Sequence, residues 1–326
     1  MPRVNLVQSI PMNPMNPMNH PDNSNSNRAT RLLYESGQGW GKEILPFLGK
    51  PEIRTLTTVN KGFHHAIHRA PIRKGWDWQF QKIKGDIVKE IKSPCVYPES
   101  ILSTENELLV SGRLSHVIHV ISKETGKALR QLKCQHEDYG VWTMFTIGTE
   151  IYVLLYEKII VLKSSSDDTI VREWTCKGLD MTFTSKAIIV LYERILTFYD
   201  YYGAFLYTLT IPMPNPCKSM LAIGEDIALF DAIKKQVCVL SADGNIKYNI
   251  PCPFAKTQWV SMTFIPDIEE LIVCDNNSST VGALNTHTKE SRIIHSNFFQ
   301  YPHDSVYTTE GLYIVVRNHD KIYLLH

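Results

Sequence analysis

One short pattern of apolar strands and polar turns recurs six times between residues 100 and 326, with a period of about 40 residues. Each unit reads as an apolar strand, a break, a second and more apolar strand, a third strand, a polar turn and a last strand. The second strands centre on Leu108–Val110, Ile151–Val153, Ile188–Val190, Ile227–Leu229, Leu271–Val273 and Leu312–Ile314. Four strands per unit at this period are typical of propeller blades. The sequence therefore predicts a mainly β protein in which residues 83–326 form a six-bladed β-propeller.

The sixth unit contains no fourth strand before residue 326. A strand-like run at residues 86–91 precedes the first complete unit and belongs to no unit of its own. We expect this run to pair with the last blade as its outer strand. Such pairing closes the ring and leaves no unpaired strand edge at the junction.

The first strands of the six units align on one apolar residue each, namely Ile101, Met144, Met181, Met220, Met262 and Val306. Each of these follows a small or acidic residue, and the six preceding residues are Ser100, Thr143, Asp180, Ser219, Ser261 and Ser305. Innermost strands of a propeller run along its axis, so these side chains are expected to surround one mouth of the central channel. Two interpretations stay open, namely tight packing of small residues at a crowded axis and a ring that faces a ligand.

Aromatic side chains in the loops are the second kind of candidate for binding. Tyr201 and Tyr202 lie in a predicted turn, and Trp142 and Trp259 lie beside first strands. Exposed aromatic residues often dominate protein interfaces, although packing between blades is the alternative. The predicted site for a protein substrate, at the propeller mouth and loops, comprises Ser100, Trp142, Asp180, Tyr201, Tyr202, Trp259 and Asp304.

The first 82 residues differ from the repeats. Residues 1–30 are rich in Asn, Pro and Ser and are predicted to form a disordered tail. In residues 31–82, Ile53, Leu56, Val59 and Phe63 recur at steps of three and four, which indicates an amphipathic helix. The sequence thus predicts a small all-α module in front of the propeller.

Residues 43–63 of this module resemble an F-box. The matching residues are Ile44, Phe47, Leu48, Ile53, Leu56, Val59, Asn60, Lys61 and Phe63. The segment departs from the family in having Gly39-Trp40-Gly41 near the place of the opening Leu-Pro. The resemblance implies docking on a Skp-type adaptor protein of a cullin ubiquitin ligase, with the propeller holding the target. The residues it implies for adaptor contact are Ile44, Phe47, Leu48, Pro51, Ile53, Leu56, Val59 and Phe63.

Charge and composition exclude several other classes. The net charge of +1 gives no electrostatic basis for nucleic-acid binding, and no apolar run is long enough for a membrane span. The seven cysteines form no C-x-x-C pair, so reduced core thiols in a cytoplasmic or nuclear protein are expected, in the host cytosol if the source is an intracellular bacterium or virus.

Neither paired catalytic carboxylates nor a metal-ligand pattern is evident, so we expect no enzyme activity, no cofactor and no metal. Two alternatives to the F-box receptor stay open. One is a propeller enzyme of the calcium-dependent lactonase or hydrolase type with a helical cap. The other is a non-catalytic scaffold in which the helices brace the ring.

Overall fold

The computed structural model describes residues 83–112, 115–134, 140–163, 169–213 and 215–326. The chain divides into two compact units, Met1–Gln79 and Phe80–His326, and the described residues belong to the second. The predicted tail, the helical module and every F-box residue named above lie outside the described residues.

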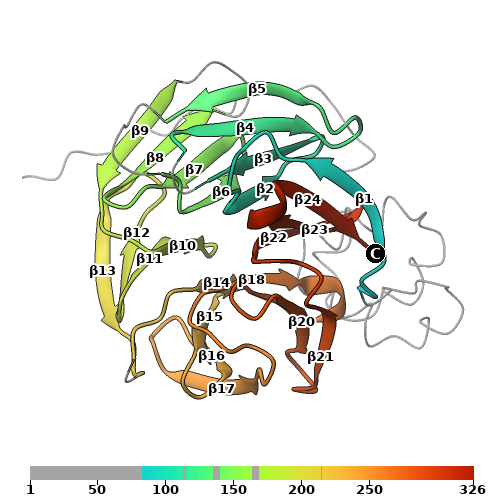
Figure 1. Ribbon diagram of the computed structural model, residues 1–326. Helices are drawn as coiled ribbons and strands as arrows, with labels where there is room; N and C mark the ends of the chain where they lie inside the picture. Colours follow the sequence, from blue (N-terminus) through green and yellow to red (C-terminus); the bar gives the residue numbers. More distant parts are fainter. Residues whose placement is uncertain (1–82, 113–114, 135–139, 164–168, 214) are drawn as a thin grey trace, which may run out of the picture. The chain divides into compact units, whose positions relative to one another are not determined.

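The second unit contains six antiparallel four-stranded sheets. Figure 1 shows that they are arranged in a ring, so the predicted six-bladed propeller is confirmed. Blades 1 and 2 comprise β2 (Ser100–Ser103), β3 (Glu107–Ser111), β4 (Val117–Ser122), β5 (Ala128–Lys133), β6 (Thr143–Ile147), β7 (Glu150–Leu154), β8 (Lys158–Lys163) and β9 (Ile170–Thr175). Blades 3 and 4 comprise β10 (Asp180–Phe183), β11 (Ile188–Tyr192), β12 (Ile195–Tyr199), β13 (Phe205–Thr210), β14 (Met220–Ile223), β15 (Asp226–Asp231), β16 (Gln236–Leu240) and β17 (Ile246–Pro251). Blades 5 and 6 comprise β18 (Val260–Ile265), β19 (Glu270–Asp275), β20 (Thr280–Asn285), β21 (Ser291–Ser296), β22 (Pro302–Thr308), β23 (Gly311–Val316), β24 (Lys321–Leu325) and β1 (Ile87–Lys92).

Strand β1 supplies the outer strand of the last blade. It pairs antiparallel with β24, with Ile91 opposite Ile322. The backbone N–H of His326 also donates to the carbonyl of Asp86 at 3.0 Å. The two ends of the described chain are therefore joined within one sheet, which closes the ring as the sequence indicated.

The apolar core is divided among the six junctions between neighbouring blades. Six separate clusters of buried side chains each draw on two adjacent blades, including the junction of blades 6 and 1. Second strands are buried on both faces, which explains why their sequences are continuous apolar runs rather than alternating ones. All seven cysteines are buried, and none forms a disulfide, as expected.

The antiparallel order gives each blade two distinct ends. First strands begin at the end where second strands lead into third strands, and we call this the mouth end. Third strands turn into fourth strands at the opposite end, which we call the turn end. Within the described residues, the two short helices are 3-10 turns, and no helix is long and apolar enough to cross a membrane.

Candidate functional site

The register of the innermost strands defines one equivalent position per blade at the mouth end. In blade 3, Met181 lies opposite Val190 of the second strand, and in blade 6 the corresponding pair is Ser305 and Ile314. The residue before this pair is Asp180 in blade 3 and Asp304 in blade 6. The ring is therefore Ser100, Thr143, Asp180, Ser219, Ser261 and Asp304. The sequence alignment that placed Ser305 in this ring was wrong by one residue, because it matched Val306 to the methionines by hydrophobicity and not by strand pairing.

Asp180 and Asp304 make the same contacts on opposite sides of the ring. Asp180 accepts a hydrogen bond from its neighbour Met181 N at 2.8 Å and one from Met220 N of blade 4 at 2.6 Å. Asp304 accepts from Ser305 N at 2.9 Å and from Ile101 N of blade 1 at 3.0 Å. Each carboxylate thus joins its own innermost strand to that of the next blade, at two of the six junctions.

The environment of these carboxylates disfavours their charge. Desolvation by burial raises the pKa of Asp180 and of Asp304 to about 7, against the backbone hydrogen bonds, which lower it. The hydroxyls of Ser100 and Ser261 also lower the pKa of Asp304, although neither forms a hydrogen bond of good geometry. Both aspartates keep partial solvent contact, as expected for side chains beside a central axis. The pair can therefore change protonation near neutral pH.

Aromatic rings capped by cations surround this ring of polar residues at the mouth end. The ammonium group of Lys218 lies 3.6 Å from the ring centroid of Trp259. Lys177 lies 5.6 Å from the ring of Tyr156 and 5.1 Å from that of Tyr192. Such contacts hold both the aromatic and the charged group at the surface in fixed geometry.

Two further contacts extend this surface around the mouth end. Trp142 lies beside Tyr156, with ring centroids 6.1 Å apart. Arg317 lies over Tyr97 at 5.5 Å and also pairs with the buried carboxylate of Glu99 at 3.2 Å. The mouth end therefore presents amphipathic side chains of the kinds that are enriched at protein interfaces.

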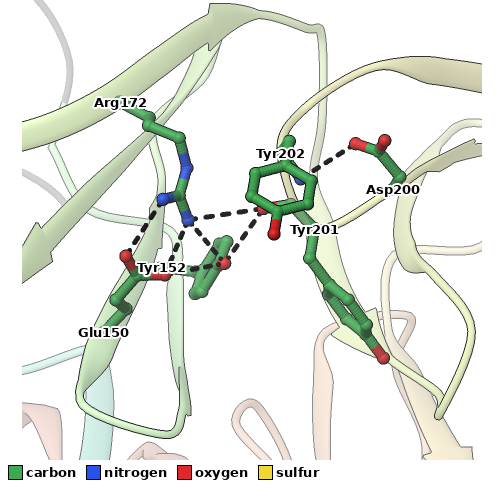
Figure 2. A network of polar contacts seen from close by, with 6 residues as sticks. All are labelled: Glu150, Tyr152, Arg172, Asp200, Tyr201 and Tyr202. Atoms are coloured by element: carbon green, nitrogen blue, oxygen red, sulfur yellow. Dashed lines mark hydrogen bonds and ion pairs between the residues drawn. The ribbon is translucent and has the colours of Figure 1, made fainter. Parts of the chain in front are cut away.

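The turn end of blades 2 and 3 carries a separate polar network, which Figure 2 shows. Arg172 donates to both carboxylate oxygens of Glu150 at 3.0 and 2.6 Å and to the Tyr152 hydroxyl at 2.9 Å. It also reaches the backbone carbonyl of Tyr201 at 3.3 Å, and its guanidinium lies 5.7 Å from the ring of Tyr202. The Tyr202 side chain is 79% exposed, so this aromatic residue faces solvent while its neighbours are tied down.

The Glu150–Arg172 pair recurs at equivalent positions in other blades. Arg130 forms a bidentate pair with Glu107 in blade 1, and Arg292 pairs with Glu270 in blade 5 at 2.6 Å. In each case a carboxylate at the start of the second strand binds an arginine of the fourth strand, across the third strand. The network of Figure 2 is therefore one copy of a structural repeat, here extended by Tyr152, Tyr201 and Tyr202. Hydrophobic patterning does not reveal this repeat, although its separations of 23, 22 and 22 residues are present in the sequence.

The seven predicted target-binding residues fall into two groups. Ser100, Asp180 and Asp304 lie in the ring at the mouth end, and Trp142 and Trp259 lie in the loops beside it. Tyr201 and Tyr202 lie in the turn between β12 and β13, at the turn end. These two groups lie at opposite ends of the blades, so the structure separates what the sequence grouped as one site.

In the described part of the chain, no group of three or more His, Cys, Asp or Glu side chains is arranged to hold a metal ion. The four small hydroxyl residues of the ring separate its two carboxylates. Calcium sites use six to eight oxygen ligands.

Comparison with known proteins supports the fold and nothing narrower. No family model matches the sequence, and no curated protein matches it. The WD40 β-propeller domain of Doa1 is similar in structure, with a TM-score of 0.55 at 8% identity over 70% of this chain and 78% of that one. Virginiamycin B lyase from Staphylococcus aureus is similar too, with a TM-score of 0.56 at 13% identity over 73% of this chain and 98% of that one. A chain in the mitotic checkpoint complex gives 0.53 at 9% identity, over 76% and 93%. The chain thus has a propeller fold shared with WD40 proteins and with a lyase.

Proposed function

We propose that this protein is the substrate-recognition subunit of a Skp-cullin-F-box ubiquitin ligase. The helical module docks on the Skp adaptor, and the mouth end of the propeller binds the target protein. Residues 43–63 support the adaptor half through their F-box resemblance. The likeness of this fold to the WD40 propeller of Doa1 and to a chain of the mitotic checkpoint complex is compatible with the target-binding half.

The observation that carries the target-binding half is the surface of the mouth end. Tyr156 and Trp259 lie there beside cations, Trp142 lies beside Tyr156, and the six blades hold all three on one frame. Rigid, partly exposed aromatic and cationic groups lose little conformational entropy on binding, which makes them effective anchors for a partner. No chemical step is required of this chain in such a role.

Two measurements on the full chain test the proposal separately. Purified Skp-type adaptor should bind the wild type, and Leu48→Asp or Ile53→Asp should abolish binding, because a charge enters an apolar contact face. Undiminished binding in both variants would reject the assigned contact. Trp259→Ala should lose the cellular target but keep the adaptor, whereas Tyr202→Ala at the turn end serves as the matched control. Equal loss of target in both variants would reject the mouth end as the binding surface.

A second candidate is a propeller enzyme, and one observation favours it. Asp180 and Asp304 have pKa values of about 7, in the range in which a carboxyl can act as a general acid or base. Elemental analysis of the purified protein tests whether such an enzyme would be calcium-dependent. Stoichiometric calcium that is lost in Asp304→Ala would favour the enzyme over the receptor.

A further inference from the structure

The outer strand of blade 3, β13, exposes a row of apolar side chains. This strand is the last in its sheet and runs along the outer rim of the ring in Figure 1. Phe205 is 62% exposed, Leu206 45% and Tyr207 43%. An edge strand also presents backbone N–H and C=O groups that another strand can pair with.

The other five outer strands differ from β13 in carrying charge. Strand β13 reads FLYTLT and contains no charged residue. The charged residues of the other outer strands are Arg130 and Lys133 in β5, Arg172 and Glu173 in β9, Lys247 in β17, Arg292 in β21, and Lys89, Glu90 and Lys92 in β1. Charges on edge strands are a common means of preventing edge-to-edge association. Blade 3 lacks this protection.

At two positions of β13, apolar or uncharged residues stand where other outer strands have a cation. Tyr207 stands where blades 1, 2 and 5 have the arginine of the repeated ion pair, and it stacks on Phe198 with ring centroids 4.3 Å apart. Leu206 is the extra residue of a β-bulge, and the bulge of blade 4 has Lys247 at the same place. An apolar, uncharged edge thus occupies positions that other blades fill with cations.

We propose that β13 pairs antiparallel with β13 of a second copy of this chain, forming a symmetric dimer. An antiparallel pair of identical strands doubles the net charge of the strand, and β5, β17, β21 and β1 are each net positive, so pairing any of them with its own copy brings excess positive charge together. Strand β13 contains no charged residue, so a β13–β13 pair places two uncharged, largely apolar edges together. This contact occupies the β13 edge of both copies, so no third copy can add through the same edge. The inference goes beyond the receptor function and does not depend on it.

The size of the contact sets the expected strength. One six-residue strand and its flanking side chains per copy give a contact at the low end of specific interfaces, which bury about 1,200 Å² or more in total. We therefore expect a weak dimer whose dissociation is visible over a hundredfold range of protein concentration.

Sedimentation equilibrium of the full chain tests this proposal. Leu206→Lys places one cation on the β13 edge of each copy, so the paired edges repel, and the dimer dissociation constant should rise at least tenfold. Blade 4 carries lysine at this bulge, so the fold should accept the change. Leu129→Lys is the matched control, because Leu129 is the equivalent bulge residue of blade 1 and is 52% exposed. If Leu206→Lys lowers the melting temperature, Phe205→Lys is the substitute variant.

A wild-type dimer that is weakened by Leu206→Lys and unchanged by Leu129→Lys supports the proposal. A wild type that stays monomeric at every concentration overturns it, including the case in which a strand of another protein occupies this edge. Equal dissociation constants for Leu206→Lys and the wild type also overturn it, because any dimer then uses another surface.

Discussion

The repeated carboxylate–arginine pair allows a graded prediction of stability. Replacing the arginine by methionine removes the charge and keeps most of the apolar stem, so the lost interaction is chiefly the ion pair. In blade 5 the Glu270 side chain is only 3% exposed, so Arg292→Met leaves a buried carboxylate without its ion pair, and it also removes the 2.7 Å hydrogen bond from Arg292 to the carbonyl of Ile83. Breaking a buried pair costs about 3–5 kcal/mol, and the 30% exposure of Arg292 places this case near 3 kcal/mol.

The other two blades should lose less. In blade 2 the side chains of Arg172 and Glu150 are 25% and 26% exposed, so water compensates in part. Arg172→Met also removes the hydrogen bonds to the Tyr152 hydroxyl and the Tyr201 carbonyl, which brings the cost to about 2 kcal/mol. In blade 1 the more exposed Arg130 binds Glu107 at the surface, and its loss should cost about 1 kcal/mol or less.

Urea denaturation followed by far-UV circular dichroism measures all three free energies of unfolding. Arg194→Met is the control, because this exposed arginine makes a 3.4 Å hydrogen bond to the carbonyl of Ile211, and a change below about 0.5 kcal/mol is expected. The prediction is the order Arg292, Arg172, Arg130, and not the single values. Equal costs, or a larger cost in blade 1 than in blade 5, would refute the view that burial of the ion pair sets the energy.

Further predictions concern protonation, packing and thiol chemistry. Because burial raises the pKa of Asp180 and Asp304 from 3.8 to about 7, their effect on stability is most favourable below about pH 4 and is lost as pH rises to 7. The free energy of unfolding of the wild type should therefore fall relative to that of Asp180→Ser as the pH rises from about 4 to 7, by at most about 4 kcal/mol. A difference that does not change with pH contradicts this prediction. Gly282→Ala places a methyl group against the ring of Phe254 and should cost about 2 kcal/mol or more in thermal or urea unfolding, whereas an unchanged stability shows that the ring can move. Burial raises the pKa of the Cys274 thiol to about 12, so Ellman's reagent should label it only after denaturation, and rapid labelling of the native protein disproves its burial.

The sequence predicted the architecture because its apolar runs report burial directly. The second strands are buried on both faces in every blade, and runs such as Ile188–Val190 cannot be accommodated elsewhere. The outer strand at 86–91 could be assigned because the sixth unit lacked one. Register in blade 6 was not predictable from hydrophobicity, since Val306 looks like a methionine position and only its pairing with Tyr313 shows the offset. Ion pairs between strands two and four depend on register as well, so single-residue patterning did not reveal them.

The two ends of a blade are stabilised by different means, and this bears on where binding can evolve. At the turn end, carboxylate–arginine pairs fix the fourth strand in blades 1, 2 and 5 through side chains. At the mouth end, Asp180 and Asp304 fix the innermost strands through backbone amides of the next blade, a contact that constrains no side chain of that blade. The loops beside the ring are thus free to vary in side chain while their anchor points stay fixed. A surface for partner recognition is therefore expected at the mouth end, and the uncharged edge of blade 3, which lacks the ion pair, is expected to serve association and not the frame.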